Sequence, residues 1–188
     1  MKIIYGGSFN PPTLAHYQIG EYLLNKYPKA NLIFLPTSSL YHKNDLAENK
    51  YRLEMLQIMS DKLGPRACVS DFEMKLDGYY GTSYTLSNFP NAHFVMGADN
   101  LQNICKWINF PNVVAQNKFI VLPRDNINID KVIDEDDFLK KYKDNFIILN
   151  DFVESSISST NYRTTRNKEC LLPEISNYII ANNLYKKV

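Results

Sequence analysis

Cysteine is scarce in this chain of 188 residues, which contains only three. Cys68, Cys105 and Cys170 lie far apart, and no Cys-x-x-Cys pair occurs. Disulfide frameworks and zinc sites are built from closely spaced cysteines, so this spacing argues against both classes. A reducing compartment, the cytoplasm, is therefore the expected location.

An excess of charge of one sign is also missing. The chain has 21 Lys and Arg residues against 20 Asp and Glu residues, a formal net charge of +1, and its basic residues are scattered. Proteins that bind nucleic acids usually gather Lys and Arg into a patch or stripe. No nucleic-acid partner is expected, whereas small anionic ligands are compatible with this composition.

Long apolar runs are absent as well. None approaches the ~18 residues that a membrane-spanning helix needs, and the N-terminus lacks the apolar core of a signal peptide. Hydrophobic residues make up 45% of the chain and charged residues 22%, which is typical of one globular domain with a full core. We therefore expect a single domain over residues 1–188 and no membrane partner.

Apolar, β-rich runs alternate with helical patterns along the chain. The expected strands are residues 2–5, 32–36, 67–70, 92–96, 118–122 and 146–149. The expected helices are residues 14–26, 49–62, 99–106, 131–142 and 173–184. This alternation predicts an α/β fold with a Rossmann-like, doubly wound parallel sheet, whose ligands bind beyond the carboxyl ends of the strands.

The first expected strand runs into a turn that leads to a helix. Two glycines at residues 6–7 permit a sharp turn or a close ligand approach, and two prolines at residues 11–12 delay the helix to about residue 12 or 13. His16 then falls in the first helical turn, on the face of Thr13. First-turn amides, the helix dipole and an imidazole favour a bound phosphate. An ordinary turn with a Thr cap and a surface His is the alternative.

Residues 155–163 form a second stretch of this kind, Ser-Ser-Ile-Ser-Ser-Thr-Asn-Tyr-Arg, after the last expected strand. Hydroxyl groups and first-turn amides at a helix start can bind an anion. Arg163 would lie on the same helix face as Ser159 and Thr160. Serine-rich turns are common, so this motif is weak when taken alone.

Other expected strand ends carry polar residues. Gly97 would admit a close ligand approach, and Asp99 just beyond it could bind ribose hydroxyls or act as a helix N-cap. Lys43 lies in the polar loop after the second strand, where it could reach phosphates or be an ordinary solvated lysine. Each of these residues indicates a function only in combination with the others.

Further candidates follow the third and fifth strands. A glycine-punctuated loop leads to a short helix that we expect to be capped by Thr82 or Ser83. Arg124 lies at the end of the fifth strand. Trp107, the only tryptophan, could be an ordinary core residue, and His93 is expected to be a packed residue within the fourth strand.

Gly-Gly-Ser-Phe-Asn-Pro at residues 6–11, followed by Thr-Leu-Ala-His at 13–16, resembles the signature of the nucleotidyltransferase superfamily. Ile-Ser-Ser-Thr-x-x-Arg at 157–163 resembles its second signature, and Gly-x-Asp-Asn-Leu at 97–101 matches a further motif. Nearly the whole chain resembles the bacterial nicotinate-nucleotide adenylyltransferases. One departure is Ala15, where that family usually has glycine.

This resemblance implies transfer of the adenylyl group of ATP to the pyridine mononucleotide nicotinate mononucleotide, with release of pyrophosphate. Magnesium would be held largely by the phosphates and water, with no metal site made by the protein. The implied catalytic residues are His16, Lys43 and Arg163. The implied ATP-binding residues are Gly7, Ser8, Phe9, Thr13, His16, Gly97, Asp99, Ile157, Ser158, Ser159, Thr160 and Arg163. The implied substrate-binding residues are Tyr84, Thr85, Trp107, which would stack on the pyridine ring, and Arg124.

Two alternatives stay open. A related nucleotidyltransferase acting on nicotinamide mononucleotide or phosphopantetheine would share His16 and the serine-rich motif. A non-enzymatic nucleotide-binding module would be favoured if catalytic positions were lost, and only Ala15 points in that direction. The sequence leaves open the choice between nicotinate and nicotinamide mononucleotide, and whether the chain forms a homo-oligomer.

Overall fold

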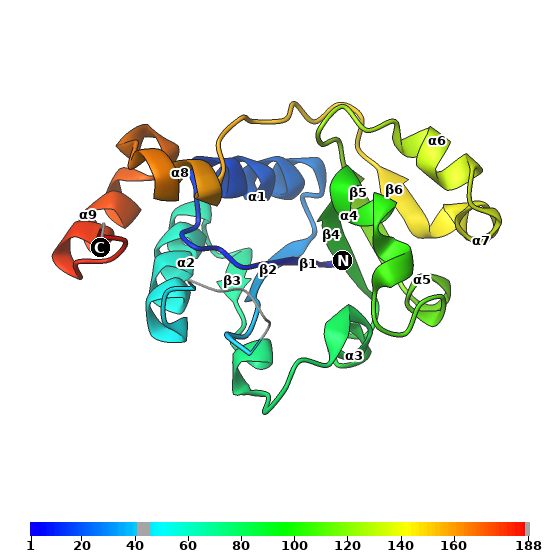
Figure 1. The fold of residues 1–188 in the computed structure, drawn as a ribbon, viewed down its shortest axis with the longest axis horizontal. Coiled ribbons are helices and arrows are strands. Elements are labelled where there is room, and N and C mark those ends of the chain that lie inside the picture. The colour runs from blue at the N-terminus through cyan, green and yellow to red at the C-terminus, as the bar shows by residue number, and fades with distance from the viewer. Residues whose placement is uncertain (41–45, 187–188) are drawn as a thin grey trace. The chain divides into compact units, whose positions relative to one another are not determined.

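The structure is a computed structural model that describes residues 1–40 and 46–186. Six strands follow one another in the sheet in the order β3-β2-β1-β4-β5-β6 (Figure 1). The chain divides into two compact units. Unit 1 consists of Met1–Gly6 and Tyr80–Glu154, and unit 2 consists of Gly7–Tyr79 and Ser155–Val188. The α/β fold predicted from the alternation of strands and helices is confirmed.

Unit 1 contains parallel strands with buried side chains. They are β1 (Lys2–Gly7), whose last residue belongs to unit 2, β4 (Ala92–Gly97), β5 (Lys118–Leu122) and β6 (Phe146–Ile148). Ile120 of β5 lies opposite Val95 of β4 and Ile147 of β6. Four successive residues of β5 are buried, the pattern of a parallel strand that is covered on both faces.

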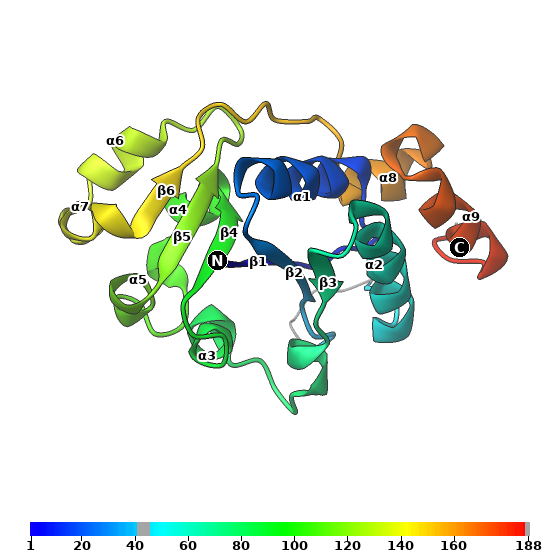
Figure 2. The same ribbon diagram turned by 180° about the vertical axis from the view of Figure 1, so that it is seen from behind.

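Short helices connect these strands (Figure 2). They are α3 (Gly81–Ser87), α4 (Ala98–Gln102), α5 (Asn112–Gln116), α6 (Ile129–Asp134) and α7 (Asp137–Lys141), with 3₁₀ turns η2 (Ile104–Lys106) and η3 (Lys143–Asn145). The single helices predicted over 99–106 and 131–142 are wrong, because each is two segments. Asp136 starts the second segment of the latter by accepting from the amides of Phe138 and Leu139, as an N-cap does.

The predicted cap of α3 is also wrong. The helix starts earlier than expected, with Tyr80 in the N-cap position in place of Thr82 or Ser83 and no side-chain cap. Thr82 and Ser83 therefore lie inside the helix. Gly81 has a φ of +79°, a conformation that glycine adopts without strain, and an added Cβ would lie 2.8 Å from the Cβ of Ile108.

Unit 2 contains the parallel pair β2 (Asn31–Pro36) and β3 (Ala67–Val69). Its helices are α1 (Leu14–Lys26), α2 (Asn49–Leu63), α8 (Ser159–Thr165) and α9 (Pro173–Ala181), with 3₁₀ turns η1 (Phe72–Lys75) and η4 (Lys168–Cys170). A Cβ added to Gly20 of α1 would lie 2.9 Å from Leu63 and 3.2 Å from Phe34. The helix therefore packs closely on both α2 and β2.

The boundaries of α1 agree with the prediction, whereas the ends of β1 and α9 differ from it by two or three residues. The first strand continues to Gly7, two residues beyond the predicted end, and the Gly7 carbonyl accepts from the Thr37 amide at 2.9 Å. Helix α9 ends at Ala181, three residues early, and Asn183 has a φ of +53°. Among the described residues, no helix is both long and apolar enough to cross a membrane.

Candidate active site

The turn after β1 places His16 at the start of α1, in unit 2. Thr13 is the N-cap and His16 is the third residue of the helix. The Thr13 amide donates to Nδ1 of His16 at 2.9 Å, and Oγ1 of Thr13 lies 2.8 Å from the same nitrogen. A ring nitrogen that accepts a hydrogen bond carries no proton, so this geometry assigns the ring proton to Nε2. The prediction that His16 lies in the first turn and faces Thr13 is confirmed.

Phe9 and Thr13 are enclosed and support His16. Phe9 is 1% exposed and Thr13 is 0% exposed. The Phe9 ring lies edge-on to His16, with centroids 5.0 Å apart, and edge-on to Phe34. Its φ of +44° costs a residue with a side chain about 1–3 kcal/mol, which the packing must offset. A Cβ on Gly7 would lie 3.2 Å from the Phe9 ring, so the strand tip has little room for a side chain.

The serine-rich motif holds the same turn. Ser159 Oγ donates to the Pro11 carbonyl at 2.7 Å, and Arg163 Nη1 donates to the Asn10 carbonyl at 2.6 Å. Figure 1 shows α8 beside the start of α1. The two stretches that the sequence predicts as anion sites therefore meet in unit 2, although Asn10 and Arg163 are 153 residues apart.

The remaining residues of the motif organise the start of α8. Ser158 is its N-cap, and its hydroxyl accepts from a first-turn amide at 3.0 Å. Thr160 accepts from Arg163 Nη2 at 3.2 Å, which confirms that these two share a helix face. The Ile157 amide donates to Ser155 Oγ at 3.2 Å. Lys43 lies outside the described residues, so its predicted phosphate contact is untested.

Sequence reasoning missed Arg52. Its guanidinium is buried within α2 and donates to the carbonyl of Ser8, a predicted ATP-binding residue, at 2.9 Å. The available signal was an Arg inside the otherwise apolar face of an amphipathic helix. Such an Arg needs hydrogen-bond acceptors inside the protein.

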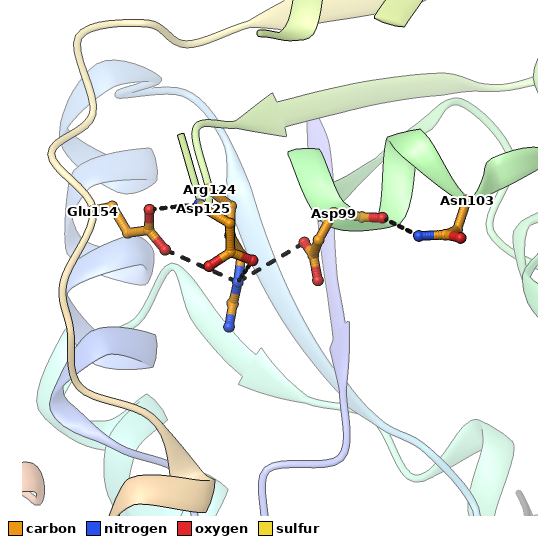
Figure 3. Close-up of polar contacts among 5 residues, drawn as sticks. All are labelled: Asp99, Asn103, Arg124, Asp125 and Glu154. Carbon is orange, nitrogen blue, oxygen red and sulfur yellow. Dashed lines mark hydrogen bonds and ion pairs between the residues drawn. The ribbon is translucent and has the colours of Figure 1, made fainter. Parts of the chain in front are cut away.

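In unit 1, an Arg124 cluster of four residues lies where β4 and β5 end (Figure 3). Arg124 Nε lies 3.9 Å from Asp99, 3.7 Å from Asp125 and 4.0 Å from Glu154. Glu154 also accepts from the Asp125 amide at 2.9 Å. The four side chains are 39–65% exposed, so solvent screens these ion pairs. One cation faces three carboxylates, and Glu154 is a member that no sequence motif indicates.

Gly97 makes room for Asp99. A Cβ at Gly97 would lie 2.4 Å from Oδ1 of Asp99 and 3.1 Å from Cδ of Arg124. Gly97 itself is the N-cap of α4 and Asp99 lies in its first turn, so the alternative role of Asp99 as N-cap is wrong. Among the described residues, Asp99 Oδ1 is buried without a hydrogen-bond partner. The same oxygen is the one that lies 3.9 Å from Arg124 Nε, beyond hydrogen-bond distance.

The predicted pyridine-binding residues also lie in unit 1. Trp107 is partly buried, with its ring edge-on to Phe94 and Phe119 at centroid distances of 6.0 and 6.5 Å. Tyr84 is 42% exposed, whereas Thr85 is 2% exposed. Packing on the strands accounts for the position of the indole, and stacking on a ligand stays a prediction.

Within the ranges 1–40 and 46–186, no group of three or more His, Cys, Asp or Glu side chains could hold a metal ion.

Comparisons with known proteins agree with this geometry. The family model described as cytidylyltransferase-like matches residues 4–165. Proteins named "Probable nicotinate-nucleotide adenylyltransferase" are 33% identical in Clostridium acetobutylicum, over 98% of both chains, and 32% identical in Caldicellulosiruptor saccharolyticus, over 100% of both. The solved Plasmodium falciparum nicotinic acid mononucleotide adenylyltransferase complexed with NaAD is 25% identical, with a TM-score of 0.79, over 98% of this chain and 96% of that one.

Proposed function

The chain belongs to the cytidylyltransferase-like family and, within it, to the nicotinate-nucleotide adenylyltransferases, and from this premise we propose that it adenylylates nicotinate mononucleotide in NAD biosynthesis. An oxygen of the mononucleotide 5′-phosphate attacks the α-phosphorus of ATP. The bond between that phosphorus and the bridging oxygen to the β-phosphate breaks. The products are nicotinate adenine dinucleotide and pyrophosphate, without a covalent intermediate on the protein.

One observation supports this function most directly. Ser159 and Arg163 of the second signature donate to the carbonyls of Pro11 and Asn10 in the first. These two bonds tie the turn that carries His16 to the start of α8. Preorganised hydrogen-bond donors are the main source of catalysis in phosphoryl-type transfer, where the transferred group carries dispersed negative charge.

His16 and Arg163, both in unit 2, are proposed catalytic residues, and Lys43, which lies outside the described residues, is proposed as a third on the resemblance alone. Since Nδ1 of His16 accepts from Thr13, Nε2–H is the donor that the imidazole offers to a phosphate oxygen. Arg163 would add a cation beside the same phosphates. Gly7, Ser8, Phe9, Thr13 and the serine-rich motif would bind ATP around them.

Unit 1 would bind the nucleoside parts. The Asp99 carboxylate, whose side chain is 41% exposed, would accept from a ribose hydroxyl, and Gly97 leaves room for that carboxylate. Trp107, Tyr84 and Thr85 would contact the pyridine ring and its carboxylate. Arg124 would contribute a positive charge to the same substrate.

Magnesium is proposed to enter with ATP. The ion keeps several water ligands and binds nucleotides mainly through phosphate oxygens, so it needs few protein ligands. It would neutralise charge on the departing pyrophosphate.

The other proposals concern the whole chain. The family match spans residues 4–165 and so includes parts of both units, which supports one nucleotidyltransferase domain over 1–188. Three free thiols, with Cys68 and Cys105 exposed, support the cytoplasm as its location. ATP and a pyridine mononucleotide are the proposed partners, without nucleic acid or membrane, and a homo-oligomer is an option that gel filtration would decide.

A pyrophosphate-release assay tests the function. ATP would be supplied with nicotinate mononucleotide, nicotinamide mononucleotide or phosphopantetheine in turn. We expect the highest kcat/KM with nicotinate mononucleotide. A higher value with another acceptor would identify a related nucleotidyltransferase, and ATP binding without pyrophosphate release would identify a non-enzymatic module.

A further inference from the structure

Arg52 is a charged side chain with no exposed surface. It donates from Nε to the Ala47 carbonyl at 3.0 Å, from Nη1 to the Ser8 carbonyl at 2.9 Å and from Nη2 to Asn49 Oδ1 at 2.6 Å. All three acceptors are uncharged, and burial lowers the pKa of Arg52. Burying a cation opposite neutral acceptors costs folding free energy. The groups that Arg52 holds in place are therefore important to the protein.

Asn10 is also held by two hydrogen bonds, one of them from a residue far along the chain. It is 3% exposed, and its Oδ1 accepts from the Ala47 amide at 3.0 Å and from the Tyr185 hydroxyl at 2.8 Å. The Tyr185 ring lies edge-on to Tyr162, with centroids 6.0 Å apart. Burial raises the pKa of Tyr185 above its ordinary value, so the hydroxyl keeps its proton and its role as donor at neutral pH.

These contacts fix the phosphate loop, residues 8–11. The N–H and C=O of a peptide unit point in opposite directions, so holding the Ser8 carbonyl also sets the direction of the Phe9 amide. The Phe9 ring in turn lies 5.0 Å from His16. Movement of the loop would therefore displace both the phosphate-facing backbone and the imidazole.

We propose that Arg52 and Tyr185 are positioning residues for adenylyl transfer. They hold the phosphate loop in its ATP-binding geometry without contacting the substrates. The C-terminal segment after α9 thereby becomes part of the active-site architecture. The inference rests on the proposed function, because it takes the phosphate loop to be the site of the ATP phosphates.

Tyr178 provides a matched control. It lies in α9, and its hydroxyl donates to Glu54 of α2, so Tyr178→Phe also removes one hydrogen bond from a tyrosine hydroxyl, here an exposed one to a carboxylate. That bond reaches no residue of the phosphate loop. A role in general stability predicts changes in ATP kinetics that follow the melting temperature of each variant, whereas a positioning role predicts a change in ATP kinetics in Tyr185→Phe alone.

The decisive experiment compares kcat and the KM values for ATP and nicotinate mononucleotide in Tyr185→Phe, Tyr178→Phe and wild type, with melting temperatures. We expect Tyr185→Phe to lower kcat/KM for ATP roughly threefold to tenfold and to leave the KM for the mononucleotide within about twofold. Tyr178→Phe should retain wild-type kinetics. Equal kinetics in the two variants would overturn the proposal.

Arg52→Lys gives a second test, because lysine keeps the charge but loses the planar fork. A folded Arg52→Lys should lose about tenfold or more in kcat/KM for ATP, and Tyr185→Phe decides the matter if that variant does not fold. Calorimetric titration with ATP alone separates the two proposals. A wild type that binds ATP without forming the dinucleotide refutes only the function, and the ATP affinity of Tyr185→Phe then decides the positioning role. A wild type that binds no ATP refutes both.

Discussion

The phosphate loop of unit 2 and the Arg124 cluster of unit 1 are built by different means. Around the phosphate loop, arginines and hydroxyls donate to neutral carbonyls and amides at 2.6–3.0 Å, and Arg52, Asn10 and Thr13 are at most 3% exposed. In the Arg124 cluster, exposed groups pair at 3.7–4.0 Å. Buried hydrogen bonds fix geometry, whereas exposed ion pairs leave side chains free to rearrange. The loop suits a group whose charge develops during reaction, and the cluster suits a substrate that must enter and leave.

The largest effect should come from His16→Ala. It removes the Nε2–H donor, and we expect kcat to fall by roughly two to four orders of magnitude while ATP binding survives. His93→Gln, a change in unit 1, is the control and should retain activity. Near-normal turnover of a folded His16→Ala would show that His16 is not a catalytic residue.

Arg163→Gln should rank next. The loss of a cation and of the bond to the Asn10 carbonyl should weaken ATP about tenfold to a hundredfold and the mononucleotide much less. Arg124→Gln is the matched change in the other unit and should mainly weaken the mononucleotide. Titration of each ligand alone measures both affinities. If Arg163→Gln weakened only the mononucleotide, the assignment of ligands to the two regions would be wrong.

Glycine-to-alanine changes at two strand ends, Gly7 and Gly97, compare the surroundings of the phosphate loop with the Arg124 cluster. In Gly97→Ala, the new Cβ would lie 2.4 Å from a carboxylate that can rotate away. In Gly97→Ala, the affinity for ATP should therefore fall about tenfold, while the melting temperature stays nearly constant. In Gly7→Ala, the Cβ meets the enclosed Phe9 ring at 3.2 Å, and overpacking of about 1–3 kcal/mol should lower the melting temperature. Calorimetry and ligand titration together check this, and the reverse pattern would contradict the comparison.

Trp107→Ala should have a smaller effect. Stacking contributes about 0.5–1.5 kcal/mol beyond buried area, so mononucleotide affinity should fall severalfold to about tenfold while ATP affinity hardly changes. The single tryptophan also offers a direct signal, since nicotinate mononucleotide should perturb its fluorescence. If fluorescence and affinity both stayed constant, the contacts with Phe94 and Phe119 would be the whole role of the indole.

The smallest expected effect concerns His93 in β4. Burial, and to a lesser extent Lys118 and the N-terminal ammonium group, lower its pKa from 6.5. The unfolded chain then binds the proton more readily, so the stabilising contribution is present above pH 6.5 and is lost as the pH falls through the lowered pKa. Between pH 7.5 and 5.5, the melting temperature of wild type should fall about 1–3 °C more than that of His93→Gln. Parallel curves would show that His93 does not titrate differently on folding.

Local signals in the sequence located most elements and the centre of the candidate site. Proline and threonine at residues 11–13 fix the start of α1, and the helix boundaries agree with the prediction. The same signals place His16 against Thr13. They fail where a local alternative interrupts a helix, as at Asp136, which starts a new one.

Long-range contacts could not be predicted. The hydroxyl of Tyr185 meets Asn10 across 175 residues, and Arg52 reaches Ser8 across 44. Nothing near Tyr185 in the sequence marks it as a partner of the first loop. The contact between Glu154 and Arg124 could not be predicted for the same reason. The fold, rather than a local motif, brings these two residues together.

The bond between Tyr185 and Asn10 has a consequence for how the protein is made. The phosphate loop is synthesised well before its donors Ser159, Arg163 and Tyr185, which lie 148, 153 and 175 residues from their acceptors in the sequence. A nascent chain therefore carries His16, the proposed catalytic residue, before the residues that hold the loop have been synthesised. Competence for nucleotide chemistry arises as a late event in synthesis, and products that terminate before Tyr185 lack the last hydrogen bond of the loop.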